Sequence, residues 1–239
     1  DAYHHFADPE WDGEPIDETT DKTKSEKPVA EAVKELPSSP YEPRERIKVK
    51  LRDGKEREIQ HMIQTSFWSA DGQPISAEEF LHKMFGSLPD FFKSEDELRK
   101  IWSKPDTRKA LLVKLADAGY DKGVLAMIQK LVNAEKSDLF DVLEYISFAV
   151  KPITREVRVA QAQSRIFREL DNKQKDFLGF VLAKYIETGV EDLDQEKLPE
   201  LLELKYYSMA DATEELGGVD KIKNAFIGFQ KHLYERRVG

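Results

Sequence analysis

The sequence contains no cysteine, which excludes disulfide bonds, thiol catalysis and cysteine-based zinc sites. It also lacks an uninterrupted apolar stretch of about 18 residues, the length that predicts a membrane-spanning helix. Residues 1–10 lack the basic and apolar regions of a secretory signal. These absences fit a reducing compartment, so we expect a cytoplasmic protein with no membrane partner.

Acidic residues and prolines are concentrated at the start of the chain. Residues 1–46 hold 13 acidic residues, 6 basic residues and 6 of the 11 prolines. Residues 14–45 carry few large apolar side chains to offset the entropy of ordering, which predicts a flexible acidic, proline-rich linker. Residues 1–13, dense in aromatic and histidine side chains, are predicted to end a preceding motor region. Residues 46–239 are predicted to form one helical domain.

A β-hairpin is predicted over residues 46–65. In its first strand, apolar and basic residues alternate, which places one row on each face: Ile47, Val49 and Leu51 against Lys48, Lys50 and Arg52. Asp53-Gly54 predicts a type I′ turn. Ile59, His61 and Ile63 alternate in the second strand. An isolated hairpin is marginal in water, so we expect this one to pack on the helices that follow.

Helical periodicity begins at residue 76. Ser76 with Glu79, and Ser94 with Glu97, have the spacing of capping boxes at helix starts. Apolar residues at three- and four-residue spacing predict further helices over residues 106–118, 122–132, 138–150, 154–170, 173–188, 195–207 and 219–235. The predicted fold class is therefore mainly α: a multi-helix C-terminal bundle, a short antiparallel β-hairpin at its N-terminal side, and a disordered acidic linker before it.

We predict no catalytic, cofactor or metal site in this segment. The phosphate-binding loop that ends Gly-Lys-Ser/Thr is missing. Pro89-Asp90 and the acids that follow resemble a metal-dependent nuclease motif only loosely, because Leu98 stands two residues before Lys100 where an acid is needed. Those acids are better explained as the start of a helix, where negative charge is favourable.

The histidines do not form a ligand set either. His4 and His5 are adjacent, without the four-residue spacing of a helical metal-binding pair. His61 alternates with two isoleucines, which is typical of a hydrogen-bonded core histidine.

Two groups of basic residues are candidates for contact with duplex DNA. Lys48, Lys50 and Arg52, with Lys55 and Arg57 at the turn, form a row that could neutralise phosphates. On the helix predicted over 154–170, three arginines lie within about 80° of one another on a helical wheel: Arg158, Arg165 and Arg168. The ordinary alternative is that both groups are solvated surface, and Glu56, Glu58 and Glu169 weaken the positive field.

Aromatic residues are frequent between residues 67 and 102, and most of them are predicted to lie in the core: Phe67, Phe80, Phe85, Phe91, Phe92 and Trp102. Trp68, before a polar turn, is the exception. We predict that it is exposed and anchors a protein partner.

The chain resembles the C-terminal region of the restriction (R, or HsdR) subunit of type I restriction-modification enzymes. The resemblance is carried by YHHFADPEWDGEP at the start and by IKVKLRDGKEREIQHMIQTSFWSADGQPISAEEFL. It continues in GYDKGVLAMIQKLVNAEKSDLFDVLEYISFA and NAFIGFQKHLYE. It implies a helical domain of a large subunit whose upstream regions hold the nuclease and the ATP-driven DNA translocase. ATP and Mg²⁺ are therefore implied upstream and not here.

The resemblance also implies partners. In that family this region is thought to attach the motor to the methyltransferase (M) and specificity (S) subunits, and it reaches duplex DNA through the complex. We therefore expect a non-catalytic docking domain. The alternative is an auxiliary duplex-DNA-binding module, and an independent enzyme is the least favoured hypothesis.

Overall fold

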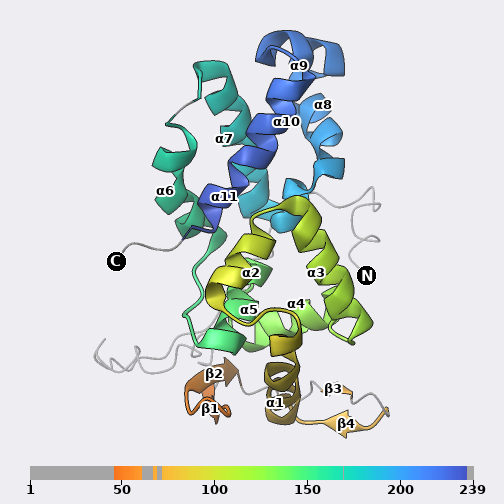
Figure 1. Cartoon of the computed structure of the whole chain (residues 1–239), viewed down its shortest axis with the longest axis vertical. Helices are drawn as coiled ribbons and strands as arrows, with labels where there is room; N and C mark the ends of the chain where they lie inside the picture. The colour runs from red at the N-terminus through yellow and green to blue at the C-terminus, as the bar shows by residue number, and fades with distance from the viewer. Residues whose placement is uncertain (1–45, 61–66, 69–71, 169, 236–239) are drawn as a thin grey trace, which may run out of the picture. The chain divides into compact units, whose positions relative to one another are not determined.

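The computed structural model describes residues 46–60, 67–68, 72–168 and 170–235. All described residues belong to one compact unit, Pro43–Gly239. This unit is mainly helical, with small antiparallel strand pairs at its N-terminal side, which confirms the predicted fold class (Figure 1). The predictions for residues 1–13 and 14–45, and those for His4, His5 and His61, lie outside the described residues.

The predicted hairpin forms between β1 (Arg46–Lys50) and β2 (Glu56–Gln60), with Val49 opposite Arg57. Its turn is not type I′, because positive φ in this loop is confined to Gly54. The Gly54 N–H donates to the Leu51 carbonyl at 2.9 Å, and the Leu51 N–H donates to the Lys55 carbonyl at 3.1 Å. The loop is therefore a three-residue connection in which glycine takes the left-handed position. A second pair joins β3 (Phe67–Trp68) to β4 (Pro74–Ile75).

The first group of helices follows the predicted starts and ends closely. Its members are α1 (Ala77–Ser87), α2 (Glu95–Trp102), α3 (Pro105–Asp117), α4 (Lys122–Leu131) and α5 (Leu139–Phe148), with a 3-10 turn η2 (Leu88–Asp90). The hydroxyls of Ser76 and Ser94 accept from the N–H groups of Glu79 and Glu97, each at 3.1 Å. These bonds confirm both serines as N-caps and fix where α1 and α2 begin, but neither described helix start shows the reciprocal bond of the predicted capping box; Glu97 Oε2 accepts instead from the Lys93 N–H at 2.8 Å.

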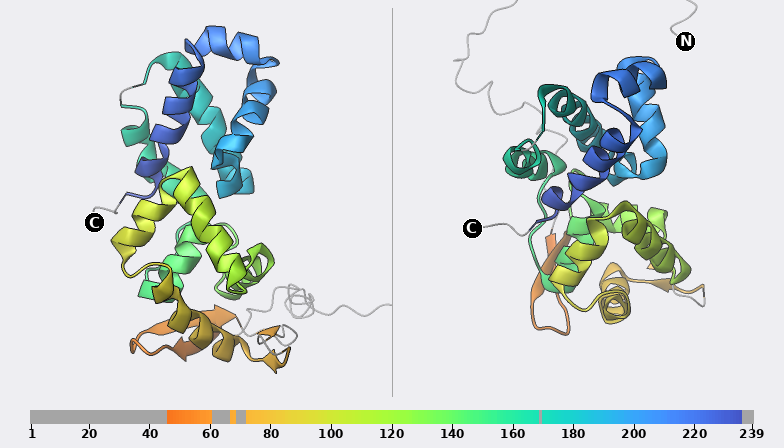
Figure 2. Two further views of the ribbon diagram at one scale, coloured as in Figure 1. Left: turned by 45° about the vertical axis from the view of Figure 1, so that its right-hand side comes forward. Right: turned by 45° about the horizontal axis from the view of Figure 1, so that its top comes forward.

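The second group differs more from the prediction. It contains α6 (Arg155–Ile166), α7 (Asn172–Thr188), η3 (Val190–Leu193), η4 (Gln195–Lys197), α8 (Leu198–Tyr206), α9 (Met209–Leu216), α10 (Val219–Gly228) and α11 (Gln230–Leu233). Helix α9 was not predicted, because only Ala212 and Leu216 of its residues are buried. The helix predicted over 219–235 is interrupted at Phe229. Figure 2 shows α7 beside α6 and α10.

The apolar faces of these helices form one core. Helix α7 contributes a run of buried residues at helical spacing: Phe177, Leu178, Val181, Leu182 and Tyr185. Phe67, Phe80, Phe92 and Trp102 are buried, and Phe85 and Phe91 pack against the core, as predicted for the aromatic set. Trp68 is 65% exposed.

The hairpin packs on the carbonyl end of α5 through two cations. Arg57 is buried, and its guanidinium donates to the carbonyls of Tyr145 at 3.2 Å and Ile146 at 2.8 Å. Lys55 Nζ donates to the Phe148 carbonyl at 3.2 Å. The last carbonyls of a helix have no partner within it, and cations there also suit its dipole. Arg57 and Lys55 therefore hold the hairpin to α5, which corrects their assignment to a DNA-facing row.

Replacing Arg57 with alanine is expected to lower the free energy of unfolding by about 2 kcal/mol, because several charge-assisted hydrogen bonds are lost. One of them joins Arg57 Nη2 to Asp53 Oδ2 at 2.8 Å, a bond that also lowers the Asp53 pKa. Urea unfolding of both proteins measures the change. Arg46→Ala is the control, because Arg46 contacts Glu58 at 3.5 Å in an exposed pair and should have no measurable effect. Equal effects of the two substitutions would contradict this account.

Candidate functional site

The described residues contain no group of three or more histidine, aspartate or glutamate side chains placed to share a metal ion. In the same parts of the chain, none of the helices combines the length and the apolar character needed to cross a bilayer. We therefore compared three other features: a cluster of buried charges, the exposed basic residues, and the exposed apolar residues.

The buried charges lie where α2, α5 and α6 meet the C-terminal segment. Asp138, the N-cap of α5, accepts hydrogen bonds through Oδ2 from the hydroxyls of Tyr185 at 2.7 Å and Tyr234 at 2.8 Å. Burial raises the pKa of both tyrosines well above the usual value, so both stay neutral donors. Asp138 thereby connects α5, α7 and the end of α11.

Two ion pairs complete this cluster. Arg158 Nη2 lies 2.7 Å from Asp141 Oδ2, and Arg99 pairs with Glu144. Burial raises the Asp141 pKa. Burial also raises the Glu144 pKa to about 7, against the opposing effect of Arg99. Because these side chains are buried and contact one another, we assign the cluster to stability and not to ligand binding.

The backbone of the C-terminal segment is held by the same arginines. Arg158 Nη1 donates to the Leu233 carbonyl, and Arg99 Nη1 donates to the Tyr234 carbonyl, both at 3.0 Å. Arg158 is only 4% exposed, so it is not available to DNA, and its prediction as a contact is wrong. On the helical wheel Arg158 lies opposite the apolar residues Val159, Ile166 and Leu170, but α11 packs against α6 on the side of Arg158.

Of the other predicted DNA contacts, Arg165 is half-buried and the rest are exposed, but they do not share one surface. Lys48, Lys50 and Arg52 lie on the hairpin, where the acids of β2 face them; Lys48 Nζ is 3.4 Å from Glu56 Oε2. Arg165 and Arg168 lie at the end of α6, beside α11, apart from the hairpin (Figure 1). The cationic set predicted from the sequence is therefore divided between two places.

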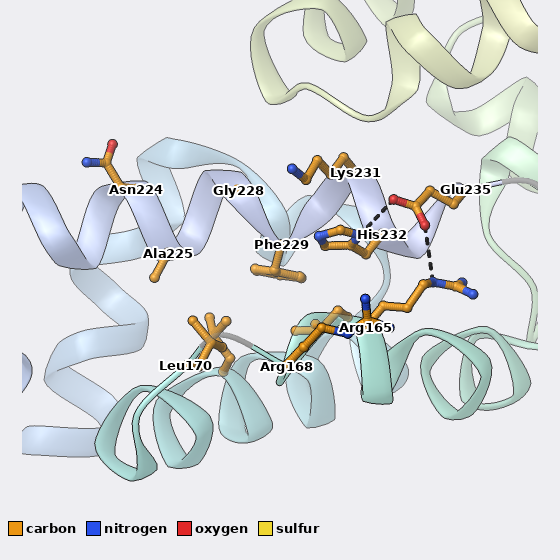
Figure 3. Close-up of a pocket in the computed structure, with 12 residues that line it drawn as sticks. Arg165, Arg168, Leu170, Asn224, Ala225, Gly228, Phe229, Lys231, His232 and Glu235 are labelled. Carbon is orange, nitrogen blue, oxygen red and sulfur yellow. Dashed lines mark hydrogen bonds and ion pairs between the residues drawn. The ribbon is translucent and has the colours of Figure 1, made fainter.

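Arg165 and Arg168 line a groove of about 440 Å³, which we call the α6–α11 groove (Figure 3). The other lining residues come from α6, α7, α10, α11 and their ends: Ile166, Leu170, Leu178, Asn224, Ala225, Gly228, Phe229, Lys231, His232 and Glu235. Sequence reasoning found two of its members. It missed Lys231 and His232, because nothing local indicates that α11 packs beside α6.

Three exposed apolar side chains lie at the end of α8 and the start of α9. Leu204 is 59% exposed, Tyr207 is 92% exposed and Met209 is 37% exposed. We call these three residues the α8–α9 corner. The helix predicted over residues 195–207 ends at Tyr207, as α8 does, but sequence reasoning missed the corner because it did not predict α9.

A scan against protein-family models matches residues 78–234 to the family described as EcoEI R protein C-terminal. The chain belongs to this family. It is thus a C-terminal domain of a type I restriction enzyme R subunit, as the resemblance of its sequence predicts. The match begins in α1 and runs through Tyr234, so it covers the α8–α9 corner and every residue of the α6–α11 groove except Glu235. Neither the curated proteins nor the solved structures include a match to this chain.

Proposed function

We propose that this domain docks the parent R subunit onto the methyltransferase and specificity subunits, and that it performs no catalysis itself. The observation that carries the proposal is the exposure of Leu204, Tyr207 and Met209 at the α8–α9 corner. Tyrosine is one of the residues that most often supply the binding energy of protein interfaces. Exposed apolar side chains close to it in the sequence support a role in association.

The backbone at Tyr207 supports the same conclusion. Tyr207 ends α8 with φ +64°, in the left-handed region where glycine is the usual helix-ending residue. A side chain in this conformation costs about 1 kcal/mol or more, yet here it is a tyrosine with almost no contacts of its own. Strain of this kind is most often kept where a side chain has a function.

Buried residues of α8 and an ion pair to α7 hold the α8–α9 corner in place. Leu201 and Leu202 of α8 are buried, and Lys205 Nζ lies 2.7 Å from Asp176 Oδ2 on α7. A surface that is ordered before binding loses little conformational entropy when a partner binds. Trp68 is a second candidate anchor, since the adjacent Phe67 stacks on Phe80 with ring centroids 4.4 Å apart.

In this proposal the linker predicted over residues 14–45 lets the motor move relative to the docked domain. A coil of roughly 30 residues spans on the order of 30 Å. ATP and Mg²⁺ act in the upstream regions of the parent.

Substituting both Leu204 and Tyr207 with serine in the full R subunit is expected to weaken its binding to the methyltransferase–specificity complex at least about tenfold, because interface anchors contribute 1–2 kcal/mol or more. Isothermal titration calorimetry measures the change. Val113→Ser with Val157→Ser is the matched control, because these valines are 54% and 42% exposed on other helices.

Deleting residues 46–239 from the full R subunit should abolish assembly and leave the motor folded. Intact assembly after that deletion would refute the proposal.

The alternative function, a module that binds duplex DNA, loses support in two ways. Arg158 is buried, and the hairpin cations face acids across the strands. The observation that still favours a phosphate ligand is the α6–α11 groove.

A further inference from the structure

We propose that the α6–α11 groove binds a phosphate ester, specifically the phosphate of a nucleotide unit, either free or within a nucleic acid strand. This inference is independent of the docking proposal, because it concerns other residues. The groove is about 440 Å³, within the range of sites that hold small organic ligands.

The charges of the groove are unbalanced. It contains three fixed cations, Arg165, Arg168 and Lys231, and a single carboxylate, Glu235. Glu235 is already shared: its Oε2 lies 3.1 Å from Arg165 Nε, and its Oε1 lies 2.7 Å from His232 Nδ1 (Figure 3). Arg168 and Lys231 are exposed, and neither has an ion-pair partner within the described part of the chain.

The excess positive charge of the groove comes with an excess of hydrogen-bond donors. Arg168 and Lys231 are donors only, and Asn224, which also lines the groove, is directed away from α6, on the same side of its helix as Lys231 (Figure 3). The carbonyl ends of α6 and α11 also lie near the groove, and each carries at most about half a negative charge, which is less than the charge of the two exposed cations. The ligand must therefore bring several acceptor oxygens and negative charge. A phosphate does so, and arginine and lysine are its usual protein partners.

The floor of the groove is apolar. Ile166 and Phe229 are buried beneath it, and Leu170 and Ala225 are partly exposed. Figure 3 shows Ala225, Phe229 and His232 directed from α10 and α11 toward α6, with Lys231 on the outer side of the same helix. Gly228 is exposed, and among the described residues none lies within 4 Å of a Cβ added there, so the groove is open beside it. An apolar floor beside a cationic rim favours a ligand with a flat organic part attached to its phosphate, as in a nucleotide.

The test measures binding of three probes to the whole chain at low ionic strength: inorganic phosphate, adenosine monophosphate and a short duplex DNA. The double substitution Arg168→Gln with Lys231→Gln is expected to weaken binding at least about tenfold and to reduce the salt dependence of duplex binding by about one to two contacts. Lys114→Gln with Lys130→Gln is the control, because it removes the same charge from exposed lysines of α3 and α4. It should leave binding unchanged.

A further variant separates ligand binding from a purely structural role of these cations. Glu235→Gln removes the ion pairs of Arg165 and His232, so it should tighten phosphate binding. If the cations only offset the charge of helix carbonyls, this substitution would not change phosphate binding. Binding of the mononucleotide identifies a free nucleotide as the ligand, and binding of the duplex alone identifies a strand. The proposal is overturned if no probe binds, or if the groove variant and the control variant bind alike.

Discussion

Replacing Arg158 with alanine is expected to lower the free energy of unfolding by about 3–5 kcal/mol, the usual result of removing one partner from a buried ion pair. The substitution removes the cation from the buried Asp141 carboxylate, which lies 2.7 Å from Arg158 Nη2. It also frees the Leu233 carbonyl and removes a cation that lies 5.1 Å from the ring centroids of both Phe140 and Tyr234. Equilibrium urea unfolding followed by circular dichroism measures the loss.

Arg165 provides the control on the same helix. Its side chain is 33% exposed and pairs with Glu235, so Arg165→Ala should cost no more than about 1 kcal/mol. Arg158→Met combined with Asp141→Asn removes both charges at once. This double variant should lose less free energy of unfolding than Arg158→Ala alone, because no buried charge is left without its counter-charge. Equal losses for the alanine variants of Arg158 and Arg165 would show that the Arg158–Asp141 pair is not buried in solution.

The contrast between these arginines shows which parts of the fold were predictable. Helix boundaries depend on local chemistry, so the predictions for α3, α4 and α7 fall within a residue or so of the structure. The caps at Ser76 and Ser94 are likewise formed by residues three positions away. Periodicity also identified the apolar side of α6, with Val159 and Ile166 buried.

The remaining features depend on contacts between distant parts of the chain. Arg158 is covered by a segment 75 residues away, and Arg57 binds a carbonyl 88 residues away. A helical wheel assigns one buried side to each helix, so it cannot show that α6 has a second side covered by α11. The same limit applies to the groove. Its arginines were visible in the sequence as a cationic face, whereas its other wall comes from the end of the chain.

Glu144→Gln is expected to remove a large part of the pH dependence of stability between pH 4.5 and about pH 7. Burial raises the Glu144 pKa from 4.5 to about 7, and one carboxylate oxygen, Oε2, has no hydrogen-bond partner among the residues that the structure describes. Arg99 bonds only to the other oxygen. The folded protein therefore keeps a proton on Glu144 over a range in which the unfolded chain has lost it.

The sign of the effect follows from this difference in bound protons. Because the folded state holds more protons, its stability falls as pH rises through this range, by up to about 3 kcal/mol for a shift of this size. The contribution is fully present below pH 4.5 and is lost above about pH 7. Burial raises the Asp141 pKa as well, which acts in the same direction. Asp53, whose pKa is lowered by its bond to Arg57, loses its contribution only at more acidic pH.

Urea midpoints at about pH 5 and pH 7.5 test this prediction in three proteins. Each protein's margin is its stability at the lower pH minus its stability at the higher pH. This margin should be larger for the unsubstituted chain than for Glu144→Gln. Glu203→Gln is the control, because Glu203 is an exposed glutamate on α8 and its substitution should leave the margin unchanged. If Glu144→Gln keeps the full margin, then Glu144 is ionised throughout this range and Arg99 outweighs burial. The buried cluster would then hold the C-terminal segment equally well at both pH values.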